Sequence, residues 1–258
     1  MSITNSFSVQ YIDHMGTDLT VVNAARASFN KQKNEGVIDE KDFSLLRFLA
    51  RGYMQSEWDG LISLLADTSD KKLIESLIWQ VKTKATHFQP FTHPQISVRI
   101  EAPLAMARQI WRSTIGVAGG DAGYPGWSEE SKRYVDETPE FFEPEIWRGR
   151  AENIKQGSSQ EVISLNTGLY KQLVELSGEC YDFMIKQGIA PEQARFSLLN
   201  SATTSWTWTG SLAFFARLCW LRKEGHAQLE SNQIAQQVEE IIQPLFPFSW
   251  AALHNYKG

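Results

Sequence analysis

Cysteine is nearly absent from this chain of 258 residues, which contains only Cys180 and Cys219. Neither cysteine has neighbours at the spacing of a metal site, so we interpret both as reduced, structural thiols. No stretch of about 18 apolar residues occurs, and no membrane-spanning helix is therefore predicted. The N-terminal segment lacks a basic stretch followed by an apolar run, so we expect no signal peptide and predict a cytoplasmic protein.

An excess of positive charge is also missing. The formal net charge is -5 and the sequence pI is about 5.6. Proteins that bind duplex nucleic acid usually carry a basic surface, so this class of partner is not expected. A small anionic ligand remains compatible with the composition, because a few arginines close together are enough to bind one phosphate.

Signals for nucleophilic or metal catalysis are absent too. The sequence has no G-x-S-x-G elbow, and Cys219 lies among apolar residues of a predicted helix, as buried structural cysteines do. His87 and His93, in HFQPFTH, are not at helical i, i+4 spacing and have no nearby cysteine or glutamate. We therefore expect no metal site.

Aromatic residues, by contrast, are abundant. Nine tryptophans occur, and hydrophobic residues make up 42% of the chain, enough for a sizeable core. Tryptophan at this density is typical of a core and sometimes of a site that stacks planar rings. No linker or low-complexity block divides the chain, so a single domain over residues 1–258 is predicted.

Helical periodicity dominates the chain, and a few segments alternate as strands do. Asp18 is expected to cap the first helix, and Pro103 to stand at a helix start. Residues 135–158 are polar and irregular. The pattern predicts an α+β (mixed α/β) fold with a small central β-sheet wrapped by many helices. The strands are expected at 7–16, 95–103 and 203–210, and the helices at 18–29, 40–54, 70–84, 104–113, 161–188, 190–200, 211–225 and 226–242.

One run, residues 108–134, combines a cationic helix end, a loop with five glycines over 116–126, and the polar cluster SEESKRY. The glycine loop could cradle a phosphate with backbone N–H groups, but it matches neither common phosphate-binding motif, and taken alone it favours a flexible loop. Several arginines lie within or beside apolar segments, which favours an anionic ligand that contains a ring. These arginines are Arg108, Arg112, Arg133, Arg195 and Arg222.

The order of several segments resembles that of the flavin-dependent thymidylate synthase family. The segments cover most of the chain, except for residues 31–70 and, less securely, 135–160. VVNAARASF resembles the family's N-terminal helix. Five motifs follow it in the family's order, and although each alone is modest, five in order are fairly specific. They read HFQPFTH, EAPLAMARQIWR, SEESKRY, PEQAR and LRKEGHAQLE.

The resemblance implies roles for individual residues. A pyrimidine deoxynucleotide monophosphate is expected to contact one set, in which Arg195 binds the phosphate and Arg222 is the catalytic residue that polarises the pyrimidine ring. Arg108 is expected to contribute less and to serve as a control. The expected nucleotide set is Gln109, Arg112, Glu129, Ser131, Lys132, Arg133, Arg195 and Arg222. The expected flavin set is His87, Gln89, Arg112, Ser113, Thr114, Glu129, Ser211 and Arg217.

The chain also departs from the family pattern. The family signature R-H-R-x-x-S-x-N-E-x-S-x-R reads Arg112-Ser113-Thr114 in its first triplet here, and Ser128 replaces the asparagine. The glycine loop fills a longer gap between the two halves, and we expect it to become ordered when nucleotide and flavin bind. Ser211 and Ala213 stand where the family contacts flavin, so loss of charge there is expected to weaken or reshape flavin and folate binding.

The implied activity is reductive C5 methylation of dUMP to dTMP, with FAD as cofactor and methylenetetrahydrofolate and NADPH as co-substrates. A homotetramer with shared active sites is implied as well. The altered triplet leaves two alternatives open. One is hydroxymethylation or methylation at C5 of dUMP or dCMP, and the other is a nucleotide-binding homologue without catalysis.

Overall fold

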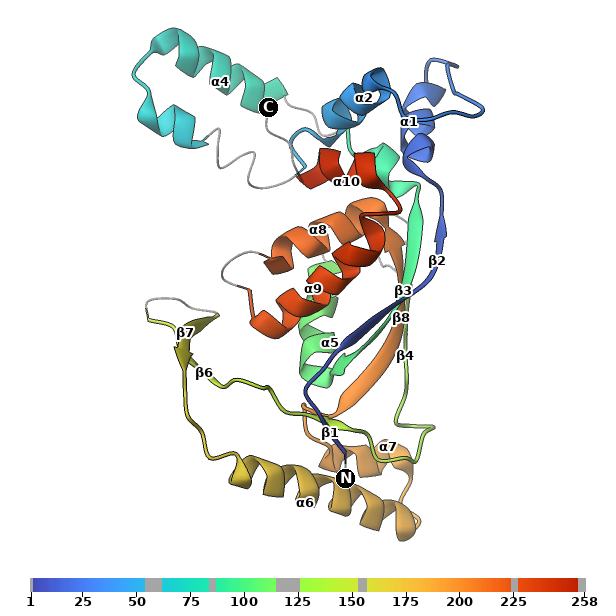
Figure 1. Cartoon of the computed structure of the whole chain (residues 1–258), viewed down its shortest axis with the longest axis vertical. Coiled ribbons are helices and arrows are strands. Elements are labelled where there is room, and N and C mark those ends of the chain that lie inside the picture. The colour runs from blue at the N-terminus through green and yellow to red at the C-terminus, as the bar shows by residue number, and fades with distance from the viewer. Residues whose placement is uncertain are drawn as a thin grey trace.

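The computed structural model describes residues 2–53, 62–83, 87–114, 126–152, 157–223 and 227–254. Its centre is a four-stranded antiparallel sheet with the order β2-β3-β8-β4 (Figure 1). The strands are β2 (Ser8–Met15), β3 (Gln95–Pro103), β8 (Thr203–Ser211) and β4 (Gly126–Glu129). This arrangement of strands and surrounding helices confirms the α+β prediction.

Alternation along β3 and β8 explains why the sheet has one apolar face. Ile96, Val98 and Ile100 of β3 are fully buried. On β8, Trp206 and Trp208 are at most 1% exposed. Successive side chains of a strand point to opposite faces, so the residues between them form a polar face.

On that polar face the side chains bind one another across the strands. The hydroxyls of Ser97 and Thr209 share a hydrogen bond of 2.8 Å, and Arg99 donates from Nε to Ser205 Oγ at 2.9 Å. Cross-strand pairs of this kind hold the register of neighbouring strands.

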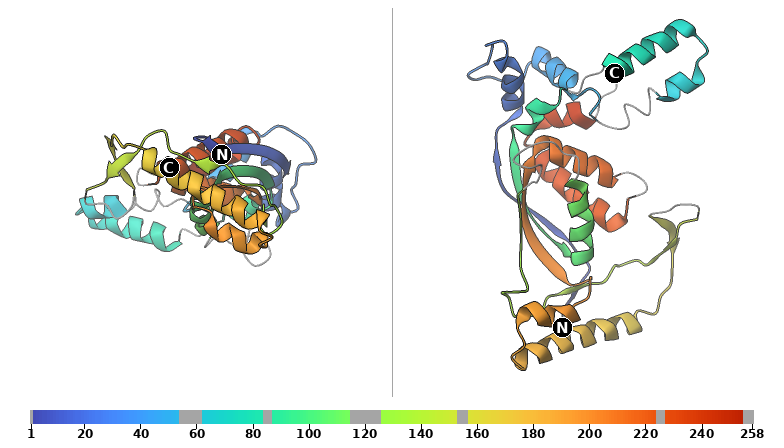
Figure 2. Two further views of the ribbon diagram at one scale, coloured as in Figure 1. Left: turned by 90° about the horizontal axis from the view of Figure 1, so that it is seen from below. Right: turned by 180° about the vertical axis from the view of Figure 1, so that it is seen from behind.

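Three helices cover the apolar face of the sheet, as both the front and the back view show (Figures 1 and 2). Helix α8 is apolar nearly all round because it lies between the sheet and other helices. Together with the sheet these helices enclose the main hydrophobic core. They are α5 (Leu104–Trp111), α8 (Leu212–Lys223) and α9 (Leu229–Ile242).

The remaining elements lie at the two ends of the sheet (Figure 1). The upper end carries α1 (Asp18–Ala27), α2 (Glu40–Ala50), α4 (Lys71–Thr83), α10 (Pro247–His254) and the short 3-10 helix η1 (Gln89–Thr92). The lower end carries α6 (Gly168–Lys186), α7 (Pro191–Ala194) and η4 (Arg195–Ser197). Two small sheets complete it, β1 (Ile3–Thr4) with β5 (Phe141–Phe142) and β6 (Arg148–Arg150) with β7 (Ser158–Val162).

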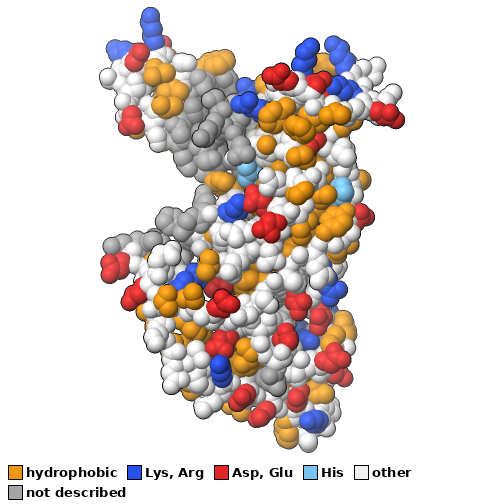
Figure 3. All heavy atoms as spheres, viewed as in Figure 1, with side chains coloured by type: hydrophobic (Ala, Val, Ile, Leu, Met, Phe, Trp, Pro, Cys, Tyr) orange, Lys and Arg blue, Asp and Glu red, His pale blue; other side chains and the backbone are white. Residues whose placement is uncertain are grey.

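Acidic and basic side chains are interspersed on the face shown in Figure 3. Within the described ranges, no helix combines the length and the apolar character that crossing a membrane requires. The same residues contain no cluster of three or more histidine, cysteine, aspartate or glutamate side chains that could hold a metal ion.

The prediction for Asp18 is wrong. Thr17 is the N-cap of α1, and Thr17 and Thr20 form its capping box. The Asp18 carboxylate instead accepts hydrogen bonds from the backbone N–H groups of Phe248 (3.1 Å) and Ser249 (2.7 Å). It therefore caps the first turn of α10, which is distant in sequence.

The helix predicted over 161–188 begins later than expected. Residues 158–162 form β7 and pair with β6, and α6 begins only at Gly168. Asn166 accepts a hydrogen bond from the Gly168 N–H at 3.0 Å, a local turn that precedes the helix. Residues 135–158 are also less irregular than predicted, because β5 and β6 lie within them.

Candidate functional site

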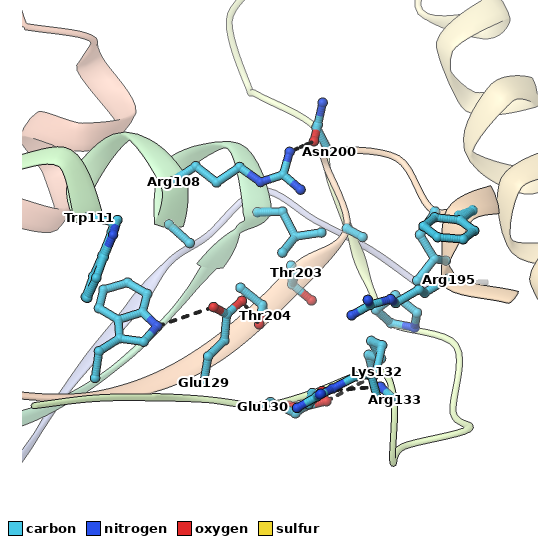
Figure 4. A pocket seen from close by; sticks show the side chains of 18 residues that line it. Arg108, Trp111, Glu129, Glu130, Lys132, Arg133, Arg195, Asn200, Thr203 and Thr204 are labelled. Carbon is cyan, nitrogen blue, oxygen red and sulfur yellow. Dashed lines mark hydrogen bonds and ion pairs between the residues drawn. The ribbon is translucent and has the colours of Figure 1, made fainter. Parts of the chain in front are cut away.

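A cavity of about 730 Å³ opens beside α5, at the lower end of the sheet (Figure 4). Its wall comes from α5, from β4 and the segment after it, from η4, and from the chain that leads into β8. Four cationic side chains and two carboxylates face one another across it. These six are Arg108, Lys132, Arg133, Arg195, Glu129 and Glu130.

One end of the cavity is cationic and consists of Lys132, Arg133 and Arg195 (Figure 4). The Nε of Arg195 donates to the Glu192 carbonyl at 3.1 Å, and this bond anchors one edge of the guanidinium. Arg133 donates from Nε to Ser131 Oγ at 3.1 Å. Forked guanidinium donors at one end of a cavity are suited to a phosphate group.

Lys132 is less available than the two arginines. Its Nζ lies 2.9 Å from a carboxylate oxygen of Glu130 and donates to the Glu137 carbonyl at 3.2 Å. These contacts hold the ammonium beside the cationic end, where it adds positive charge without a forked donor pair.

The opposite end pairs a carboxylate with indole rings. Glu129 accepts a hydrogen bond on each oxygen, from Thr204 Oγ1 at 3.0 Å and from Trp127 Nε1 at 3.3 Å. The Trp127 ring stacks on Trp206 at 4.7 Å between centroids and meets Trp111 edge-on at 5.0 Å. The β4–β8 pairing creates this end, because it sets Glu129 opposite Trp206 and Trp127 opposite Trp208.

Arg108 lines the same cavity, so it is not a suitable control for Arg195, although a smaller effect on the ligand was expected of it. Its Nη1 donates to Asn200 Oδ1 at 2.9 Å (Figure 4). The sequence showed Arg108 beside an apolar face, but nothing in it indicated Asn200 or Thr204. Sequence reasoning therefore missed seven lining residues with polar or aromatic side chains: Trp111, Trp127, Glu130, Phe196, Asn200, Thr203 and Thr204.

A second group of predicted residues lies apart from this lining. Arg222 of α8 donates from Nε and Nη2 to Ser113 Oγ at 2.9 and 2.6 Å, and from Nη2 to the Gln109 carbonyl at 3.0 Å. Burial lowers the pKa of the Arg222 guanidinium, and no described carboxylate lies at ion-pair distance from it.

The neighbouring residues Gln109 and Arg112 also lie apart from the cavity lining. The Oε1 of Gln109 is buried and has no hydrogen-bond partner among the described residues. Arg112 is exposed at the start of η2 (Arg112–Thr114), and the side chain of Thr114 lies outside the described residues.

A third group lies towards the upper end of the sheet. His87 precedes η1 and stacks on Phe48 with 5.6 Å between ring centroids, and Gln89 of η1 is exposed. Ser211 is not free for a ligand, because its Oγ accepts the Phe214 N–H at 3.1 Å and caps α8. The Nη1 of Arg217 is buried and has no hydrogen-bond partner in the part of the chain that the structure describes.

The comparison with known families gives one match to nearly the whole chain. The profile described as "Thymidylate synthase complementing protein" matches residues 10–248. The chain belongs to this family.

Several curated relatives carry the name flavin-dependent thymidylate synthase. The protein of Pseudothermotoga lettingae is 26% identical over 249 residues, which are 96% of this chain and 90% of the relative. The protein of Thermotoga neapolitana is 27% identical over 97% of this chain and 93% of its own length. A solved structure of the UMP/dUMP methylase PolB from Streptomyces cacaoi, bound with 5-Br dUMP, has the same fold, with a TM-score of 0.72 at 22% identity over 99% of this chain and 98% of that chain.

Neither cysteine of the chain lines the cavity. Cys219 is buried, its Sγ lies 3.4 Å from the Ala235 carbonyl, and burial raises the pKa of its thiol. Cys180 is exposed on α6. Of the glycine loop at 116–126 only Gly126, the first residue of β4, belongs to the described residues.

Proposed function

We propose that this chain is a flavin-dependent enzyme that methylates C5 of dUMP to give dTMP. One observation carries the proposal beyond family membership: the cavity has forked cationic donors at one end and a carboxylate with indoles at the other. A nucleoside monophosphate has the matching polarity, with an anionic phosphate at one end and a planar ring at the other.

The residues at each end support separate tasks. Arg133 and Arg195 would bind the phosphate, with Ser131 and Lys132 beside them. Glu129 would accept a hydrogen bond from the sugar or the ring, because each of its oxygens has one protein donor and a second lone pair for a ligand. The structure thus brings together five of the predicted nucleotide-binding residues: Glu129, Ser131, Lys132, Arg133 and Arg195.

The chain also offers groups that fit a flavin. The buried, unpaired Nη1 of Arg217 is a cationic donor in need of an acceptor, such as a phosphate or a flavin carbonyl. His87, Gln89 and Arg112 are exposed and would hold other parts of the cofactor. When bound, reduced flavin supplies the hydride for a methylene group taken from methylenetetrahydrofolate, and NADPH supplies the reducing equivalents. The protein's own contribution is binding, orientation and charge.

A complete site requires a second copy of the chain. Arg222, Gln109 and Arg112 do not line the cavity, yet Arg222 Nη1 and Gln109 Oε1 have no partner among the described residues. These groups would meet the nucleotide if another subunit brought its α5 and α8 to the cavity. We therefore propose a homo-oligomer with shared sites, and a homotetramer as its form.

Helix α6 supports such an assembly. Its inner side contacts the rest of the chain through Val174 and Tyr181, both fully buried. The outer side carries apolar residues spaced alternately four and three apart, the spacing of a helix that packs on another helix. They are exposed in the single chain: Leu169 (78%), Leu173 (48%), Leu176 (63%), Cys180 and Phe183 (62%).

Product analysis tests the function. The purified chain is incubated with FAD, NADPH and methylenetetrahydrofolate and with dUMP, dCMP or UMP in separate reactions, and the products are identified by mass spectrometry. A mass gain of one methyl group on dUMP is expected. A hydroxymethyl product or a preference for dCMP or UMP would support the alternative modification. Tight dUMP binding without any product would support a homologue without catalysis.

We propose that residues 1–258 act as one domain, so that heating should give one cooperative unfolding transition. We also propose a cytoplasmic location.

A further inference from the structure

The guanidinium of Arg222 has a strongly uneven environment. Nε and Nη2 are bonded to Ser113 Oγ and to the Gln109 carbonyl, at 2.6 to 3.0 Å. Nη1 has no partner among the described residues. One edge of the fork is therefore held by the protein, and the other is left for a ligand.

Ser113 holds the Nε–Nη2 edge of Arg222 through its hydroxyl oxygen. It is only 6% exposed and belongs to η2, directly after α5, whereas Arg222 lies near the end of α8, 109 positions away in sequence. A hydroxyl oxygen has two lone pairs, and both accept from the guanidinium here. Its small side chain lets α8 approach closely enough for that contact.

No carboxylate among the described residues neutralises the charge of Arg222. Its visible partners are a hydroxyl and a carbonyl, which are uncharged, and burial lowers its pKa. A partly buried cation with neutral partners is attracted to an anionic ligand or to a carbonyl on which negative charge develops. Without the Ser113 contact the long side chain would lose its fixed direction, since a free arginine has many rotamers.

We propose that Ser113 is a positioning residue, which holds the Nε–Nη2 edge of Arg222 so that Nη1 faces the pyrimidine ring of the bound nucleotide. The inference rests on the proposed function and differs from the flavin contact expected for Ser113. It explains how a serine in the signature triplet contributes to the site although its hydroxyl is already occupied.

The test compares Ser113→Ala with Ser113→Thr, which keeps the hydroxyl. Ser231→Ala is the matched control, because Ser231 of α9 is also buried, its Oγ donates to the Gln228 carbonyl at 2.8 Å, and it does not line the cavity. In Ser113→Ala the kcat for dUMP is expected to fall about tenfold while KM changes less than about threefold, since binding by the phosphate end is retained. Ser113→Thr should recover most of the loss, and Ser231→Ala should keep the parental kcat.

Two further measurements separate positioning from a merely structural tie between α5 and α8. In an Arg222→Ala background, Ser113→Ala should have no additional effect on kcat, because the group it positions is gone. Labelling of Arg222 by phenylglyoxal, followed by mass spectrometry of its peptide, should be at least about fivefold faster in Ser113→Ala than in the parent.

Contrary results would overturn the inference. They are an equal kcat in Ser113→Ala and parent, a full additional loss in the Arg222→Ala background, or unchanged labelling of Arg222. If Ser113→Ala does not fold, Ser113→Cys takes its place, because a thiol of similar size accepts hydrogen bonds only weakly. The proposed function is judged separately, by whether the parent converts dUMP at all.

Discussion

Replacing Arg195 by alanine should weaken dUMP binding through the loss of a phosphate contact. Arg195 lines the cationic end of the cavity, and its Nε is held by the Glu192 carbonyl at 3.1 Å, so Nη1 and Nη2 remain for the ligand. A hydrogen bond to a charged group contributes about 1.5–3 kcal/mol. The side chain is exposed, so solvent screens part of this contribution, and Lys132 and Arg133 line the same end of the cavity and would share the phosphate. We expect a net loss of about 2 kcal/mol, or roughly 30-fold in affinity.

The assay is calorimetric titration with dUMP in the presence of FAD, at low and at physiological salt. Arg195→Lys should lose roughly fivefold, because the charge stays but the forked donors do not. Arg150→Ala is the charge-matched control, since Arg150 is exposed on β6 and does not line the cavity. If Arg195→Ala binds dUMP within twofold of the parent at both salt concentrations, the phosphate assignment is wrong.

Three further outcomes are expected. Arg217→Ala should lower FAD affinity about tenfold in an absorbance titration, because the buried Nη1 loses its cofactor partner; unchanged affinity would remove Arg217 from the flavin site. A short bis-maleimide should link Cys180 to Cys180 of a second copy, since Cys180 lies within the outer apolar stripe of α6 and Cys219 is buried; a chain that stays unlinked while eluting as an oligomer would exclude α6 from the interface. Asp18→Ala should lower the free energy of unfolding in urea by about 1–2 kcal/mol, because the carboxylate caps α10; a stability equal to the parent's would contradict that role.

Local pattern was sufficient for most of the elements. The alternation in QISVRIEAP and TTSWTWTG predicted β3 and β8, because a strand with one buried face must repeat every two residues. Glycine likewise marked the end of α6 correctly, since Gly188 adopts a φ of 79° just beyond it. Pattern failed at residues 161 and 162, where pairing of β7 with β6 outweighed helical spacing, and α6 begins only at Gly168.

For the site as well, motif order identified some residues, and only tertiary packing identified the others. Motif order in the sequence was enough to indicate the family and to name Glu129, Ser131, Arg133 and Arg195, which the fold does bring to one cavity. Because side-chain direction depends on how distant segments pack, no spacing in the chain could show that Arg108 lines that cavity or that Asp18 caps α10.

The contact between Ser113 and Arg222 shows the limit most clearly. The sequence determined that a serine follows Arg112 and that an arginine ends an apolar helix. Only the packing of α5 and α8 against one face of the sheet decided that these two side chains meet, 109 positions apart. Hydrogen bonds act over about 3 Å, so such a pairing depends on tertiary geometry that residue types and their spacing do not contain.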